Sequence, residues 1–420
     1  LIEHKFESGI TLQNRTNYTT YDKFYQNVFA SGGVDTLSSV SLGAYNNTTT
    51  RDNVFNQTNL LYSLNTGPIS HTLMAGIEVG RQETHNRRET GLFDSRDASS
   101  TSISVPLSNS VTHLPIAFRN RNSGGDVDAL NRSVVNVTSL YIQDQIEIIP
   151  QLQVIAGVRY DLFEVDFQQK NGPRDHLKTR DDLIAPRFGV VFKPFDPISF
   201  YASYSQAYVP RAGDQLASLN VTIETLKPEK FTTLETGVKW DIRPDLALTG
   251  AVYQLDRTNV INSVTPGQTF LSKGQRTHGV EITLTGQLTP KLSVMGGYAY
   301  QVGELTNDVF AVAKKGASVA ELPRHTFSVW SRYDFTPRIG AAFGVIYRDD
   351  MFASLTNKVR LPDFTRVDAA LFAQLSKSFR AQLNIENLLD TKYFAAAHND
   401  FNISPGAPIT VRASLIANFQ

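Results

Sequence analysis

The chain has 420 residues, a mean hydropathy of −0.22, 40 basic and 40 acidic residues, and no cysteine. The balanced charge creates no global field for nucleic acid, and the lack of cysteine excludes disulfides and thiolate metal sites. No run approaches the roughly 18 apolar residues of a membrane-spanning helix, but a membrane barrel escapes that test because half of each strand is polar.

Alternating apolar and polar residues predict an all-β chain of about seventeen strands. The expected strands are 2–7, 10–21, 51–65, 69–84, 133–148, 152–168, 182–193, 198–210, 229–242, 246–260, 272–288, 291–306, 321–335, 338–351, 363–377, 379–388 and 407–419. Residues 36–47 either extend the third strand or belong to the loop before it. Many strands exceed the about 9–11 residues that cross a bilayer, so we expect them to project beyond the outer surface.

Short turns and long polar loops alternate between these strands. The turns are centred on Ser8-Gly9, Gly67-Pro68, Pro150-Gln151, Asp196-Pro197, Pro244-Asp245, Thr289-Pro290, Pro337-Arg338 and Lys377-Ser378, where Pro, Gly and Asp favour tight reversals. The longest loop runs from about His85 to Arg132. Strict alternation predicts a transmembrane antiparallel up-and-down β-barrel with short periplasmic turns and long extracellular loops.

The last strand supports this interpretation. Val411, Leu415 and Phe419 alternate with polar residues such as Arg412 and Ser414. An outer-membrane barrel typically ends on such a strand, with lipid on one face and a polar lumen on the other. The same phase predicts a charged inner wall that contains Arg159, Asp161, Arg187, Arg332, Asp334, Arg348, Arg366, Asp368, Arg380, Glu386 and Arg412.

Several phrases then occur in a recognisable order: Phe200–Pro210, Leu226–Lys230, Glu235–Trp240, Gln275–Glu281, Leu322–Phe327, Asn384–Asp390 with Lys392-Tyr393, and Pro405–Pro408. In this order the chain resembles the barrel of TonB-dependent outer-membrane receptors, in the ferric-siderophore branch and most of all its catecholate-type members. The resemblance covers essentially the whole chain. It implies a barrel of 22 strands around an N-terminal plug.

The chain departs from that family pattern in three ways. It lacks the plug domain and the energy-coupling box. About seventeen strands are expected where the family has 22, so residues 1–420 are expected to form one barrel domain that is N-terminally truncated before the sixth strand. Gln420 follows the usual terminal aromatic, and Ile409 replaces an Arg of the family.

The start of the chain is a separate observation. It opens on the strand-like Leu1-Ile2-Glu3 without a signal peptide, which indicates a mature start or a missing beginning.

No enzymatic motif is present. The sequence contains no His-Glu-x-x-His, no Gly-x-Ser-x-Gly and no Gly-Lys dipeptide. We expect no catalytic residue, no bound metal and no cofactor, with iron arriving only inside a ferric siderophore. Asp181-Asp182, at a loop–strand junction, is expected to be solvated. A passive porin of 16–18 strands is the main alternative, and a soluble all-β carbohydrate-active enzyme is a third.

Ligand capture is assigned to inward-facing residues near the extracellular mouth. Arg forms forked bonds to oxygen-rich anions, and aromatic rings stack on flat ligands. The candidates are Arg119, Arg121, Tyr208, Arg211, Arg324, His398 and Phe401, for each of which an ordinary loop role competes. The resemblance implies a Gram-negative outer-membrane receptor that imports ferric siderophores. Its implied partners are the TonB-ExbB-ExbD complex, engaged through the missing N-terminal region, and outer-membrane lipid with lipopolysaccharide, but no nucleic acid.

Overall fold

The computed structural model describes residues 1–97, 99–123, 126–172, 176–211, 227–265, 268–272, 274–309 and 312–418. Within these ranges, 19 strands form one antiparallel sheet and the remaining strands form four two-stranded hairpins in the loops. The only helical element described is the 3-10 turn η1 (Leu107–Asn109). No helix in the described ranges has the length and apolar character required to cross a membrane.

Of these 19 strands, all except the short β5 and β6 build a continuous wall of seventeen, as the sequence predicted. The wall strands are β1 (Ile2–Lys5), β2 (Thr11–Ala30), β3 (Ser39–Thr66), β4 (Ile69–Leu92), β9 (Leu130–Ile149), β10 (Leu152–Gln169), β11 (His176–Phe195), β12 (Ile198–Val209), β13 (Glu229–Arg243), β14 (Leu246–Thr258), β17 (Gln275–Thr289), β18 (Leu292–Leu305), β19 (His325–Asp334), β20 (Ile339–Arg348), β23 (Phe364–Gln374), β24 (Phe379–Glu386) and β27 (Thr410–Ala417).

The remaining strands belong to the loops. They are β5 (Ser102–Pro106), β6 (Ala117–Arg119), β7 (Asn122–Ser123), β8 (Asp126–Val127), β15 (Val260–Thr265), β16 (Gln268–Ser272), β21 (Met351–Phe352), β22 (Arg360–Leu361), β25 (Phe394–Ala397) and β26 (Ile403–Pro405). Two of them extend the wall, because β5 pairs with β3 and β6 pairs with β4.

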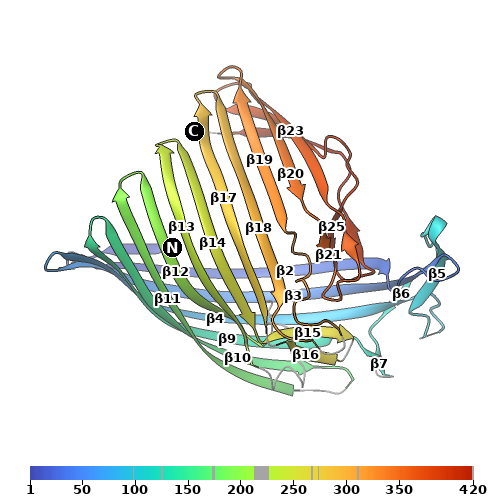
Figure 1. The fold of residues 1–420 in the computed structure, drawn as a ribbon. Coiled ribbons are helices and arrows are strands. Elements are labelled where there is room, and N and C mark those ends of the chain that lie inside the picture. The colour runs from blue at the N-terminus through green and yellow to red at the C-terminus, as the bar shows by residue number, and fades with distance from the viewer. Residues whose placement is uncertain are drawn as a thin grey trace.

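Each wall strand pairs with its neighbours in sequence, and the sheet curls so that β2 to β4 pass behind β17 to β20 (Figure 1). The hairpin tips that follow β11, β13, β17 and β19 line one rim, whereas β15, β16, β21 and β25 lie at the opposite ends of the strands (Figure 1). This separation confirms the up-and-down topology with short turns on one rim and long loops on the other.

Several strands are longer on the loop side than predicted. β2 continues to Ala30, β3 begins at Ser39 and β4 continues to Leu92. The loop between β4 and β9 is therefore shorter than expected, and most of segment 36–47 joins the third strand. Water bathes both faces of a sheet that projects beyond the membrane, so the apolar–polar alternation that reveals a strand fades there.

The sheet has two open edges. β1 pairs with β2 over Ile2–Lys5, and β27 pairs with β24. No ladder among the described residues joins β27 to β1 or β2. Over the described residues, the wall therefore does not close on itself into a smaller barrel.

On the polar face of the wall, aromatic side chains repeatedly pair with glycines on the neighbouring strand. Aromatic rings lie over glycines directly opposite on the next strand: Tyr141 over Gly76, Phe55 over Gly80, Tyr201 over Gly237, Tyr253 over Gly279 and Trp330 over Gly344. A Cβ on Gly237 would lie 2.7 Å from the Tyr201 ring. Each ring covers exposed glycine backbone and lies along the wall instead of projecting from it.

Apolar cores form at the loop ends of the strands. One contains Val135, Val137, Val165, Phe167 and Leu177; a second contains Val40, Leu42, Ala44, Phe93 and Val105; a third contains Met351, Ala353, Leu361 and Ala397. The first core joins wall strands to one another, the second packs loop residues Phe93 and Val105 against β3, and the third packs loop segments against each other.

Candidate functional site: the lumen wall and the extracellular mouth

The two faces of the sheet differ in chemistry. Cross-strand partners share a face, so the register can be followed from strand to strand. Val411 opposes Ile385 and Leu415 opposes Ala381, and Leu415 is 66% exposed on this apolar face. Phe419 lies outside the described residues. The charged residues predicted for the inner wall all share the opposite phase, which confirms that prediction.

Ion pairs line this inner face. Arg159 contacts Asp161 at 2.7 Å and Glu78 at 3.3 Å, and its Nη2 donates to the Ser139 hydroxyl at 2.8 Å. Pairs form along a strand as well as across strands, because residues i and i+2 project side by side. The polar wall therefore neutralises much of its own charge.

The predicted motif Asn384–Asp390 anchors a loop to this wall. Asn387 is 1% exposed, and its side chain donates to the carbonyl oxygens of Thr391 and Ala407, both at 3.0 Å. Its backbone N–H donates to Asp368, which also pairs with Arg366 at 2.7 Å. The motif thus fixes the start and end of the β24–β27 loop.

Three extracellular loops form one body. Asn357 exchanges hydrogen bonds with the backbone of Ser318 at 2.8 and 3.0 Å, and Glu321 accepts a bond from the Ala397 N–H at 2.6 Å. These contacts join described parts of loops 306–324, 349–363 and 387–409 around the apolar core that contains Met351.

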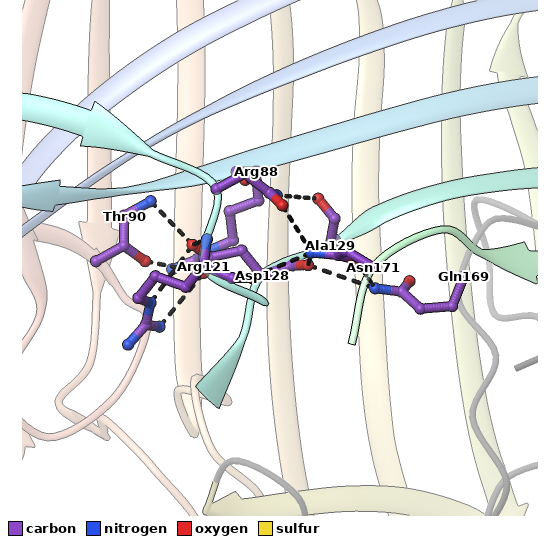
Figure 2. A network of polar contacts seen from close by, with 8 residues as sticks. Arg88, Thr90, Arg121, Asp128, Ala129, Gln169 and Asn171 are labelled. Carbon is purple, nitrogen blue, oxygen red and sulfur yellow. Dashed lines mark hydrogen bonds and ion pairs between the residues drawn. The ribbon is translucent and has the colours of Figure 1, made fainter. Parts of the chain in front are cut away.

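The long β4–β9 loop is tied to the wall by a buried carboxylate (Figure 2). Asp128 is 3% exposed and accepts hydrogen bonds from the Thr90 hydroxyl at 2.8 Å and from the Arg121 backbone N–H at 3.0 Å. The Arg121 guanidinium also pairs with it, at 3.3 Å. Asn171, from the next loop, donates to the Asp128 carbonyl at 2.8 Å (Figure 2).

A second buried carboxylate holds Arg211. The Arg211 Nε lies 2.7 Å from Asp181 Oδ1, and its Nη2 donates to the Arg180 carbonyl at 2.8 Å. Asp181 is 3% exposed, so the prediction that it is solvated is wrong, whereas Asp182 faces solvent. The two residues point to opposite faces of β11. The loop after Arg211 lies outside the described residues.

The other predicted residues are spread around the mouth. Arg119 is exposed on β6, and His398 and Phe401 are exposed in the β24–β27 loop. A Cβ on Gly33 would lie 3.4 Å from the Phe401 ring, so this loop reaches the β2–β3 loop. The expectation that Tyr208 faces inward is wrong, because its register with Lys230 puts it on the outer face with Phe200.

Arg324 lines a cavity of about 240 Å³ together with His325, Asp349, Asp350 and Arg360. Arg360 pairs with Asp350 at 2.8 Å. Within the part of the chain that the structure describes, the Arg324 guanidinium has no ion-pair partner. It remains a candidate for binding an anionic ligand.

The structure also shows an aromatic and cationic cluster at the mouth that was not predicted from the sequence. The Arg88 guanidinium lies 4.0 Å from the centre of the Tyr45 ring, which meets Tyr25 and Phe29 edge to face, each at 5.7 Å between ring centres. The register puts these residues on the inner face of the projecting sheet. Burial raises the pKa of the Tyr25 hydroxyl, and the neighbouring Tyr45 adds to that rise. Residues 86–92 were expected to be loop, residues 22–35 fell between the expected strands, and segment 36–47 was left open between strand and loop, so no strand phase was available to bring these residues together.

Charged pairs also occur on the outer face of the projecting strands. The Arg132 Nε donates to Glu83 at 2.7 Å, and this bond holds the pKa of Glu83 below its usual value.

No three His, Asp or Glu side chains gather to hold a metal ion in the described ranges.

Comparison with known proteins places this geometry in a family. The family model described as "TonB dependent receptor-like, beta-barrel" matches residues 2–388. The probable TonB-dependent siderophore receptor PiuA of Acinetobacter baumannii is 27% identical over 432 residues, which cover 94% of this chain and 57% of that protein. The catecholate siderophore receptor Fiu of Escherichia coli K12 is 25% identical over 451 residues, which cover 97% and 58%.

Solved structures agree on the fold. The crystal structure of the siderophore receptor PiuA from A. baumannii superposes with a TM-score of 0.85 at 23% identity, over 99% of this chain and 63% of that chain. The closed form of the ferric-catecholate import receptor Fiu from E. coli K12 gives a TM-score of 0.82. The chain thus spans under three-fifths of the length of these curated relatives. It belongs to the TonB-dependent receptor-like β-barrel family, whose members are receptors in the outer membrane of Gram-negative bacteria.

Proposed function

We propose that this chain forms the barrel wall of a receptor that binds ferric siderophores of the catecholate class outside the cell and imports them. The observation that carries the proposal is the cluster of Arg88, Tyr45, Tyr25 and Phe29 on the inner face of the mouth. A ferric catecholate is anionic, rich in oxygen and edged by aromatic rings. A cation beside aromatic faces matches each of those properties. The relatives named siderophore receptors give the proposal further support.

Two groups of candidate residues surround the cluster. Arg119, Arg324, His398 and Phe401 are exposed at the mouth and are proposed to contact ligand directly. Arg121 and Arg211 are held by the buried carboxylates of Asp128 and Asp181. They are proposed to hold their loops in position and to offer their remaining N–H donors to the ligand.

The missing parts of the receptor belong to the same proposal. A preceding region would supply five further strands between β1 and β27, the plug within the lumen, and the segment that engages TonB-ExbB-ExbD. Its support is the pair of open sheet edges, because unpaired backbone costs several kcal/mol per group in hydrocarbon. The apolar face would contact lipid, and the charged outer face above it would meet lipopolysaccharide. The chain is proposed to carry out no covalent chemistry and to need no cofactor.

The test uses the full-length receptor in a Gram-negative host without other catecholate receptors. Cells that express it should bind iron-55-labelled ferric catecholate and accumulate it only while TonB is present. Accumulation that continues unchanged without TonB would indicate the porin alternative. An absence of binding on correctly assembled receptor would refute the ferric-catecholate assignment.

A further inference from the structure

The lumen face of β10 to β13, the green strands of Figure 1, holds a cavity of about 480 Å³ near the periplasmic turns. Arg187, Lys193, Tyr201 and Lys239 line it. Gly189 lies between Arg187 and Val191 on β11, and a Cβ there would have no neighbour closer than 3.7 Å. The glycine therefore leaves open space at the centre. The backbone N–H of Lys193 donates to Gln151 of the β9–β10 turn at 2.7 Å, which places the cavity at the turn side of the wall.

The charge of this cavity is not balanced. Three of its lining residues are cations, and none is a carboxylate. Within the described ranges, neither Arg187 nor Lys193 has an ion-pair partner, and the same holds for Arg380 on the inner wall. Other inner-wall cations are paired: Arg159, Arg332, Arg366 and Arg412. The adjacent carboxylate of Glu235 accepts a bond from the Tyr201 hydroxyl at 2.7 Å, and the Lys239 ammonium lies 5.8 Å from the centre of the Tyr201 ring.

The chemistry of the lining selects a multiply charged anion. Cations that line one cavity raise the local concentration of anions, and an Arg fork binds paired oxygen atoms. The Tyr201 ring adds an aromatic surface. Within the proposed function, on which this step rests, the ligand with that chemistry is the ferric catecholate itself. We infer that this cavity is a second binding station, which the anionic complex occupies on its way from the mouth to the periplasm.

The test separates capture from passage in the full-length receptor. The Arg187→Gln/Lys193→Gln variant removes two charges from the cavity. Arg380→Gln/Lys377→Gln removes two charges from the turn side of the β23–β24 hairpin, where neither residue lines the cavity. Arg187→Lys/Lys193→Arg keeps the charge. Surface affinity is measured on de-energised cells with labelled ferric catecholate, and initial uptake rate is measured on energised cells.

We expect the neutralised cavity to leave surface affinity within twofold of the parent and to lower uptake at least tenfold. Both control variants should keep uptake within twofold. Equal uptake in all receptors overturns the inference. So does a fall in uptake accompanied by leakage of large antibiotics through the barrel, because that result assigns the cations to plug carboxylates. Loss of surface binding by the parent receptor would instead refute the proposed function.

Discussion

The guanidinium of Arg88 lies 4.0 Å from the centre of the Tyr45 ring, on the inner face of the sheet that projects above the membrane. Arg88 was predicted to lie in the long loop, and Tyr45 lies in segment 36–47, for which the sequence left strand and loop both open. Their stacking holds a cation at the mouth, beside two further aromatic rings. This arrangement leads to the first prediction.

Arg88→Gln in the full-length receptor should weaken ferric-catecholate binding about tenfold or more. The reason is the loss of a charge-assisted bond, worth about 1.5–3 kcal/mol. Arg81→Gln is the matched control, because Arg81 lies on the same strand with the opposite phase. Equilibrium binding to whole cells measures both variants. Equal affinity of Arg88→Gln and the parent would remove the cluster from the ligand site.

The Arg211–Asp181 pair allows structure and binding to be separated. Arg211→Met alone leaves a buried carboxylate without its cation, which costs about 3–5 kcal/mol. Arg211→Met with Asp181→Leu removes both charges. The double variant should therefore regain most of the lost free energy of unfolding, as measured by urea unfolding. If Arg211 also touches ligand, the double variant should still bind ferric catecholate about tenfold or more weakly. Parental affinity in the stable double variant would restrict Arg211 to a structural role.

Gly237→Val should slow barrel assembly. A Cβ at this position would meet the Gly250 carbonyl at 2.5 Å and the Tyr201 ring at 2.7 Å, so the ring must swing into the lumen. At Gly250 an added Cβ has no neighbour nearer than 3.8 Å, which makes Gly250→Ala the control. Heat-modifiable gel mobility reports the folded fraction. Normal assembly of Gly237→Val would show that the ring–glycine contact is dispensable.

Asn387→Ala should loosen the β24–β27 loop. The change leaves the Thr391 and Ala407 carbonyls without a donor, at roughly 1–3 kcal/mol for each unsatisfied group. It also puts alanine at a φ of 52°. Limited proteolysis should cut residues 387–409 faster than in the parent. Asn399→Ala, in an exposed turn of the same loop, should leave the anchor intact, and equal cutting of the two variants would contradict the anchoring role.

The Glu83–Arg132 bond predicts a pH dependence. Because the pKa of Glu83 is lowered in the folded protein, its stabilisation is present above the usual glutamate pKa of about 4.3 and is lost as the pH falls through the lower folded value. Glu83→Gln should therefore increase hydrogen exchange of β4 and β9 at pH 7 but not at a pH low enough to protonate Glu83 in the folded protein. Glu7→Gln, in an exposed turn, is the control. A difference between Glu83→Gln and the parent that persists unchanged at low pH would contradict this assignment.

The sequence predicted the wall because alternation carries the phase of each strand. Val411 and Arg412 were assigned to opposite faces from their neighbours alone, and the register agrees. Strand ends near the turns were also predicted closely, because Pro, Gly and Asp specify those reversals locally.

The mouth could not be predicted in the same way. Asp181 and Asp182 are chemically identical, yet one pairs with Arg211 and is buried while the other faces solvent. The Asp128 partner Thr90 lies 38 residues away. Such pairs depend on how loops and projecting strands fold back on one another, and no local sequence pattern predicts this folding.

The pairing of every wall strand with its neighbours in sequence has a consequence for how the protein is made. Long-range pairing slows folding, because the chain must close large loops before any contact stabilises it. Here each new hairpin needs only the edge left by the previous one. The wall can grow by stepwise addition, with a register error confined to the hairpin in which it occurs, and the exposed edge at each step is the surface that an insertion machine must hold.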